Sequence, residues 1–217
     1  MKQQKFTFMR VHLQKAGIHG MRVSKEKYSD QPDYRNIWHK ESRYRKAIET
    51  ADEQLGRFVD WLKSENLWDG TLLMICGDHG QANEGWHEPY SAESNVTPLL
   101  LVGAGVRTPR TFQYCEILDI APTIADVLKK KQPALSRGRI LREAFDENAV
   151  APKVPQSVKR LNKVLIKAHS LSDSQKKLLS DKGFKTLDDL GVWHKTEAGS
   201  DFEKFTSQQE AILESLD

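Results

Sequence analysis

The fold is decided by residues 71–106, TLLMICGDHGQANEGWHEPYSAESNVTPLLLVGAGV, where two apolar runs flank a polar loop. The first run, Thr71–Cys76, is short and almost wholly apolar, which is typical of a strand buried on both faces of a parallel sheet. The second run, Thr97–Val102, predicts another buried strand. Between them, the sequence GDHG at residues 77–80 lies where the first predicted strand ends.

The spacing of apolar residues predicts the elements around this segment. A long amphipathic helix is expected where they recur three or four apart, and strands where they alternate or form short runs. The predicted elements are a strand over Lys5–Leu13, a loop over Gln14–Pro32, a helix over Tyr34–Glu65, a strand over Tyr114–Leu118 and a helix from Ile120 to about Lys131. Strands that alternate with helices in this way indicate the α/β class.

The C-terminal third differs in character from the rest. The Pro-containing sequence AVAPKVP at residues 149–155 predicts a linker. Beyond it, amphipathic helices are expected over Ser157–Ala168, Ser172–Ser180 and Asp201–Leu216. The expected organisation is therefore an α/β domain over 1–148, a linker over 149–156 and a small helical appendage over 157–217.

Composition limits the classes of partner. Thirty-three basic and thirty acidic residues among 217 give a net charge of +3, too small to attract nucleic acid or anionic lipid through the overall field. No stretch approaches the ~20 apolar residues of a membrane span, and no secretory signal is recognisable. Cys76 and Cys115 lie in apolar runs, where buried free thiols are expected. Together these features slightly favour a reducing, cytoplasmic compartment.

Asp78 and His79 form a candidate pair of metal ligands. In an open α/β sheet, ligands bind at the carboxyl ends of the strands. A carboxylate oxygen beside an imidazole nitrogen suits Zn²⁺ or Mn²⁺ better than Ca²⁺ or Mg²⁺. The flanking Gly77 and Gly80 allow a sharp turn that directs both side chains at one ion. The alternative is an ordinary turn, in which Asp78 caps a backbone N–H and His79 is partly exposed.

The cluster as a whole resembles the C-terminal half of the alkaline phosphatase and sulfatase superfamily, in its sulfatase and type I phosphodiesterase-like members. The resemblance rests on a strand ending in DHG, a downstream His, the strand TPLLL and the turn GAG, and on the sequences YRKAIETADEQLGRFVDWLKSENLWDGTLL before and DIAPT after them. It covers roughly Lys5–Phe145. It implies a mixed or parallel sheet sandwiched by helices, and cleavage of phosphate or sulfate esters at a divalent metal.

The resemblance also implies roles for individual residues. It makes Asp78 and His79 ligands of one metal and His87 a candidate ligand of a second. Members with two metals carry Asp-x-x-x-His before the long helix, whereas residues 15–19 read KAGIH, so His19 is retained as a candidate metal ligand and Lys15 replaces the Asp. Lys15 either pairs with an anionic phosphate or sulfate or is an ordinary exposed lysine. His12 is a candidate for substrate binding by position only.

The chain departs from the family pattern in one respect. Family members have a strand ending in a metal-binding Asp, followed by a helix that starts with a Ser, Thr or modified Cys nucleophile, and no residue here matches that motif. We therefore expect either the second half of a longer or split ester hydrolase, inactive alone, or a non-catalytic interaction or scaffold protein on a degenerate hydrolase fold. The first expectation includes a small anionic ester as substrate. Self-association, or a partner that covers an exposed sheet edge, is expected in addition.

Overall fold

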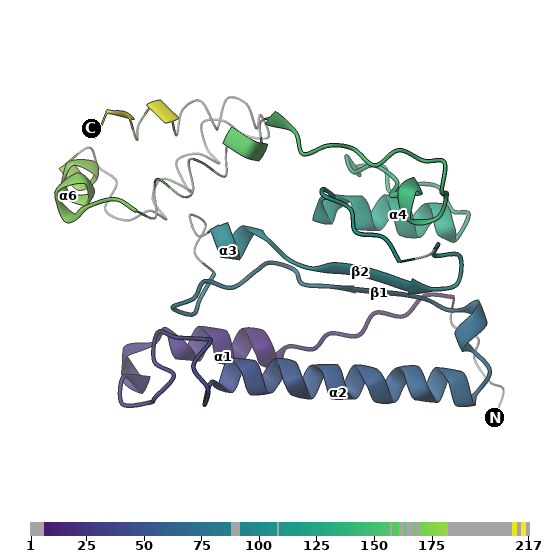
Figure 1. The fold of residues 1–217 in the computed structure, drawn as a ribbon, viewed down its shortest axis with the longest axis horizontal. Helices are drawn as coiled ribbons and strands as arrows, with labels where there is room; N and C mark the ends of the chain where they lie inside the picture. Colours follow the sequence, from purple (N-terminus) through teal and green to yellow (C-terminus); the bar gives the residue numbers. More distant parts are fainter. Residues whose placement is uncertain are drawn as a thin grey trace. The chain divides into compact units, whose positions relative to one another are not determined.

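The computed structural model describes residues 7–87, 92–107, 109–156, 158–160, 163, 167, 170–181, 210, 211, 214 and 215. Its helices and strands are labelled along the chain in Figure 1. The chain divides into two compact units. The first comprises Met1–Gln14, Thr50–Asp78 and Leu99–Lys153, and the second comprises Lys15–Glu49, His79–Pro98 and Val154–Asp217.

A two-stranded antiparallel sheet lies in the first unit. Strand β1 (Leu72–Cys76) pairs with β2 (Leu99–Gly103), and the two run side by side in Figure 1. Both strands were predicted, and the α/β class is confirmed. Their antiparallel pairing fits the mixed form of the expected sheet and not the purely parallel form. Leu100 and Val102 of β2 are 52% and 40% exposed, so the apolar run does not reflect burial on both faces.

Helix α2 (Arg43–Ser64) confirms the predicted long helix but begins at Arg43 rather than at Tyr34. Two side chains fix its start. The Ser42 hydroxyl accepts a hydrogen bond from the Tyr44 N–H at 3.2 Å, and the Asp33 carboxylate accepts one from the Arg43 N–H at 3.0 Å. Both satisfy N–H groups that have no partner within the helix, which is the role of an N-terminal cap.

Helix α4 (Ile120–Val127) confirms the helix predicted from the DIAPT sequence, and it follows a 3-10 turn at Ile117–Asp119. The strand predicted over Tyr114–Leu118 is wrong. The Asp119 carboxylate turns back to accept the Glu116 N–H at 2.9 Å, and the chain coils there instead of extending. Helix α4 ends before the predicted Lys131 because Lys129 adopts a left-handed backbone with φ 52°.

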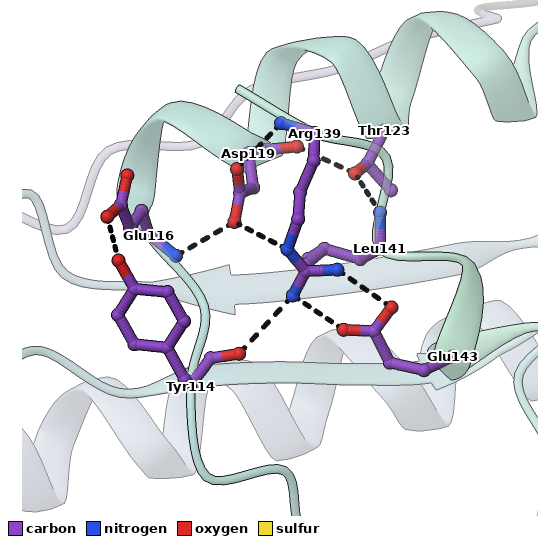
Figure 2. Close-up of polar contacts among 7 residues, drawn as sticks. All are labelled: Tyr114, Glu116, Asp119, Thr123, Arg139, Leu141 and Glu143. Carbon is purple, nitrogen blue, oxygen red and sulfur yellow. Dashed lines mark hydrogen bonds and ion pairs between the residues drawn. The ribbon is translucent and has the colours of Figure 1, made fainter. Parts of the chain in front are cut away.

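Arg139 connects α4 to the segment that follows it, as Figure 2 shows. Its guanidinium donates two hydrogen bonds to Glu143, at 2.9 and 2.6 Å, and lies 3.7 Å from Asp119. Both carboxyl-bearing residues are 3% exposed. The Thr123 hydroxyl donates to the Asp119 carbonyl at 2.6 Å and accepts from the Leu141 N–H at 3.0 Å. These contacts join α4 and the 3-10 turn before it to the residues after it, from Arg139 to Glu143.

Residues 7–13 form no regular structure, so the strand predicted over Lys5–Leu13 is wrong over its described part. Phe8, Met9, Val11 and Leu13 are all exposed, by 51–64%. An alternating apolar pattern specifies a strand only where another strand offers its backbone for pairing. The described part of the chain offers these residues no such strand.

The second unit contains a helix where a loop was predicted. Helix α1 (Lys15–Val23) replaces much of the expected loop Gln14–Pro32, which is therefore wrong. Gly20, one of the glycines that suggested a loop, serves packing instead. A Cβ at Gly20 would lie 2.6 Å from the Gln81 side chain, and the Gly20 carbonyl accepts the Trp86 N–H at 3.3 Å. Gly20 thus lets α1 pack directly on the loop that follows β1.

The remaining predictions have mixed outcomes. Helix α6 (Asp173–Asp181) confirms the helix expected over Ser172–Ser180. The helix over Ser157–Ala168 is described only in part, and most of Asp201–Leu216 lies outside the described residues. The division at residues 149–156 stays a prediction. Within the described residues, no helix combines the length and hydropathy of a membrane span.

The expected burial of the two cysteines is wrong. Cys76 and Cys115 are free and exposed. Cys76 is the last residue of β1, and Cys115 precedes the 3-10 turn that replaces the predicted strand. Their apolar sequence neighbours therefore do not enclose them.

Candidate functional site

Asp78 and His79 follow β1, as the sequence predicts. Both are exposed. Asp78 is the last residue of its segment in the first unit, and His79 is the first of its segment in the second. Because they are consecutive, a trans peptide bond holds their Cα atoms about 3.8 Å apart.

Gly80 allows close packing of the backbone, in addition to the sharp turn that the sequence suggested. Its N–H donates to the Ser94 carbonyl at 2.8 Å. A Cβ at this position would overlap the carbonyl oxygens of Glu93 and Val96. The residues after His79 therefore lie directly against α3 (Ala92–Asn95) and its C-terminal end.

The structure brings together two of the predicted histidines. The rings of His79 and His87 have centroids 4.2 Å apart and planes inclined by 45°. The Nδ1 atom of His79 lies 2.7 Å from the Gly80 carbonyl oxygen, and because a carbonyl only accepts, Nδ1 carries the proton. In the neutral ring, the lone pair is then on Nε2. A backbone carbonyl that fixes the tautomer in this way is common for metal-binding histidines.

Trp86 and Gln81 complete this cluster and were not identified from the sequence. The Trp86 indole stacks on His87, with centroids 4.3 Å apart and planes inclined by 21°. The Trp86 carbonyl accepts the Ala82 N–H at 2.9 Å and also a hydrogen bond from the Gln81 side chain. An aromatic residue directly before a candidate ligand was the only sequence signal for this role.

His19 lies on α1 in positive surroundings. Burial lowers the pKa of its imidazole, and the charges of Arg22 and Arg43 lower it further, while Asp33 opposes them. Asp33 is itself engaged, since it accepts hydrogen bonds from the Arg43 guanidinium at 3.0 and 2.8 Å. Within the described residues, the buried Nδ1 of His19 has no hydrogen-bond partner. The positive charges of Arg22, Arg43 and Lys15 around His19 suit an anion better than a second dication.

The other two candidates, Lys15 and His12, are both exposed. Lys15 is exposed at the first turn of α1, four residues before His19, so the two share one side of the helix. Its charge contributes to the lowered pKa of His19. His12 is exposed in residues 7–13 of the first unit. Across the part of the chain that the structure describes, no group of three or more His, Cys, Asp or Glu side chains is close enough to hold a metal.

Comparison with known families supports the resemblance noted above. A family model described as Sulfatase matches residues 2–130, which is more than half of the chain. The chain belongs to the Sulfatase family. This match includes the DHG sequence, both strands and α4, so the alkaline phosphatase and sulfatase relationship is confirmed.

Individual relatives carry two kinds of name. A 2,3-bisphosphoglycerate-independent phosphoglycerate mutase from Desulforudis audaxviator is 37% identical over 102 residues, covering 44% of this chain and 19% of that protein. Its counterpart from Gloeobacter violaceus is 31% identical over 127 residues, covering 54% and 22%. A choline-sulfatase from Rhizobium meliloti is 29% identical over 106 residues, covering 44% and 21%.

This chain spans about a fifth of the length of the curated relatives it matches. No solved structure matches it.

Proposed function

We propose that this Sulfatase-family chain supplies the metal-binding strand end of a hydrolase of phosphate or sulfate esters, with Asp78 and His79 as ligands and His87 beside them. The observation that carries this proposal is the His79–His87 pair, whose ring centroids are 4.2 Å apart. Two imidazoles and an adjacent carboxylate suit Zn²⁺ or Mn²⁺ better than Ca²⁺ or Mg²⁺. Such an ion, when bound, would polarise an ester oxygen.

Lys15 and His19 are proposed to face the anionic part of the ester. The positive surroundings of His19 support this, because the charges of Lys15, Arg22 and Arg43 all lower its pKa. A lysine ammonium binds phosphate or sulfate as a point charge. If His19 were the ligand of a second metal, a carboxylate would be needed beside it to neutralise the ion. The family pattern has an Asp for this purpose, and Lys15 occupies that position here. His12 stays a candidate substrate contact by position.

The apolar surfaces of the first unit support a second part of the proposal. Residues 7–13 expose Met9, Val11 and Leu13 in a period-two stripe, and β2 exposes Leu100 and Val102. A two-stranded sheet is marginal by itself and leaves a free edge on each strand. We propose that the remaining strands of a Sulfatase-family sheet, sandwiched by helices, cover these surfaces. About four-fifths of the length of each relative lies outside the part that this chain matches, which supports that occupant over a second copy.

Sedimentation tests the covering of these surfaces. We expect the 217-residue chain alone to self-associate, because exposed strand edges pair with one another. When the N-terminal portion of the Rhizobium meliloti choline-sulfatase is added, we expect a 1:1 complex of the two chains to replace the self-associated form. A chain that sediments as a monomer at all concentrations and ignores the added portion would contradict the proposal.

Hydrolysis of model esters tests the activity itself. A protein in which this chain follows the N-terminal portion of that choline-sulfatase is expected to cleave p-nitrophenyl sulfate or p-nitrophenyl phosphate when Zn²⁺ or Mn²⁺ is present. The ratio of the two rates assigns the ester class. Failure to cleave either ester, in a protein shown to be folded by circular dichroism, would argue against a hydrolase.

The alternative is a non-catalytic interaction or scaffold protein on a degenerate hydrolase fold. It is favoured by the sparse donor set, since the described residues contain no group of three or more potential ligands within reach of one metal. No residue of the chain matches the nucleophile motif of the family. Under this alternative, the chain would form the 1:1 complex but neither bind metal nor hydrolyse esters.

A further inference from the structure

Trp38 is the most exposed tryptophan among the described residues, at 58%. Its orientation is nevertheless fixed by polar contacts. The indole N–H donates to Asn83 Oδ1 at 2.7 Å, and the backbone N–H donates to Asn36 Oδ1 at 3.0 Å. The Tyr44 ring meets the indole edge to face, with centroids 6.3 Å apart. Fixing a side chain costs conformational entropy, and leaving an indole in water forgoes the gain from burying it. Such an arrangement is typical of a binding surface rather than of a core.

The backbone beneath Trp38 is also held in place. Ile37 is fully buried, and its N–H donates to the Asn83 carbonyl at 2.9 Å. Arg35 donates its N–H to the Val23 carbonyl at the end of α1, at 3.0 Å. Because both anchors lie within three residues of Trp38, the indole is attached to a well-defined part of the second unit.

Asn83, which accepts the indole N–H, belongs to the loop that carries His87. The Gly85 N–H donates to the Ala82 carbonyl at 2.9 Å, and the Ala82 N–H donates to the Trp86 carbonyl at 2.9 Å. These bonds close a tight turn with Asn83 in its middle and His87 directly after it. The contact between Trp38 and Asn83 therefore joins the exposed indole to the loop of the candidate site.

Backbone strain is found in both of these segments. The non-glycine residues with positive φ among those described are Arg35, Asn66, Trp86 and Lys129. Asn66 and Lys129 lie two residues after the ends of α2 and α4, where a left-handed residue commonly terminates a helix. Arg35 (φ 52°) and Trp86 (φ 68°) have no such explanation. Strained residues of this kind cluster at sites that bind ligands.

We propose that Trp38 is a specificity-determining residue whose exposed indole packs against the sugar ring of a phosphate or sulfate ester, with Asn83 donating hydrogen bonds to the sugar hydroxyls. The proposal rests on the proposed function, because the sugar is the alcohol part of the ester to be cleaved. One face of a sugar ring presents C–H groups, which pack on an aromatic ring, and its rim presents hydroxyls. Asn83 is exposed and uses Oδ1 for Trp38, so its amide N–H groups are the donors for those hydroxyls.

Two other alcohol parts fit this surface less well. A quaternary ammonium group would also pack on an indole face, but Arg35 and Lys40 place positive charge on both sides of Trp38 in the sequence. A plain aromatic ring would use the indole and leave the amide donors of Asn83 without a role. A sugar uses both the apolar face and the polar donors.

Saturation-transfer NMR on the 217-residue chain tests the proposal without metal or turnover. The probes are the methyl β-glycosides of glucose, galactose and N-acetylglucosamine, with tetramethylammonium and p-nitrophenol as competing classes. We expect a glycoside to bind through its ring C–H protons. Trp38→Ala should weaken this binding by at least about 10-fold, and Trp38→Phe, which keeps an aromatic face, by less than about 5-fold. Trp61→Ala should have no effect, since Trp61 is 49% exposed and stacks on Phe58 of α2.

Asn83→Asp separates the hydrogen bonds from the indole surface. Aspartate keeps an oxygen that accepts the Trp38 N–H but removes the amide donors, so glycoside binding should weaken about 3- to 10-fold. The indole N–H resonance of Trp38 should keep its hydrogen-bonded position in this variant. Unchanged indole resonances of Trp61, Trp68 and Trp86 in Trp38→Ala show that the fold is retained.

The outcomes distinguish this proposal from the proposed function. Absence of glycoside binding, equal binding by wild type and Trp38→Ala, or tighter binding of tetramethylammonium or p-nitrophenol would overturn the sugar site, even in a chain that hydrolyses esters once completed. Glycoside binding that depends on Trp38, in a completed protein that cleaves no ester, would support the sugar site and overturn the hydrolase.

Discussion

Replacing Asp78 with asparagine is expected to lower the rate of ester hydrolysis by about 100-fold or more in the protein completed with the N-terminal portion of a Sulfatase-family domain. Asparagine preserves the shape of the side chain but removes the negative charge that a bound dication needs. Because Asp78 is exposed and lies outside β1, two residues after its last residue Cys76, the substitution should leave the fold intact. The measurement is kcat with p-nitrophenyl phosphate and sulfate at saturating Zn²⁺ or Mn²⁺.

A matched control exists in the same unit. Asp69 is an exposed acid in the 3-10 turn Trp68–Gly70 that precedes β1, and Asp69→Asn should leave the rate unchanged. Equal rates for wild type, Asp69→Asn and Asp78→Asn would remove Asp78 from the site. Equal losses in both variants would indicate a general effect of charge on the protein.

Replacing Arg139 with leucine is expected to destabilise the first unit by about 3 kcal/mol, the low end of the range for breaking a buried ion pair. Asp119 and Glu143 are 3% exposed and would lose their cation, while the one-third exposure of the Arg139 side chain limits the cost. Figure 2 shows that no other cation contacts these carboxylates among the residues drawn. Urea denaturation followed by tryptophan fluorescence measures the change, with the exposed Arg142→Leu as control.

The pH dependence of this destabilisation has a defined sign. Burial would raise the pKa of Glu143, but its hydrogen bonds to Arg139 outweigh burial and the pKa lies below the usual value. A depressed pKa contributes stability that is present above the unfolded-state pKa and lost as pH falls through the folded-state pKa. Wild type and Arg139→Leu should therefore converge in stability on acidification. A difference that stays constant down to strongly acidic pH would contradict the ionic account.

Glu116 works in the opposite direction. Burial and the nearby charge of Asp119 raise its pKa, and the Tyr114 hydroxyl donates a hydrogen bond to its carboxyl group. Protonation of Glu116 on acidification therefore stabilises the fold and partly offsets the loss at Glu143. Glu116→Gln should remove this offset. Comparing the pH dependence of stability in Glu116→Gln and in Arg139→Leu with that of wild type therefore separates the contribution of Glu116 from that of Glu143.

The elements that the sequence predicts correctly are those with local signals. Short apolar runs identified β1 and β2, and apolar spacing identified α2, α4 and α6. Strand direction could not be predicted in this way, because an apolar run reports burial and not the direction of the neighbouring strand. Residues 7–13 show the same limit, since their alternation specifies a strand only when a partner strand is present. The helical state of α1 was obscured by Gly17 and Gly20.

In the candidate site, too, the sequence predicts the local features and misses the contacts between distant residues. The family resemblance made His79 a ligand of one metal and His87 a candidate ligand of a second, and the structure places the two rings 4.2 Å apart. The supporting contacts join positions far apart in sequence, such as Gly20 with Trp86 or Asp119 with Arg139, and no local pattern encodes them. Trp86 was missed for this reason, because its role depends on a backbone conformation that α1 and the loop after β1 impose together.

Metal titration of the 217-residue chain tests the central claim most directly. Calorimetry with Zn²⁺ and Mn²⁺ is predicted to give one bound ion per chain, with affinity falling at least 10-fold in Asp78→Asn and in His79→Gln. His39→Gln, whose ring accepts a hydrogen bond from the Glu41 N–H at 3.1 Å away from these residues in sequence, should bind like wild type. Absence of binding, or binding that the Asp78 and His79 substitutions leave unchanged, would contradict the account.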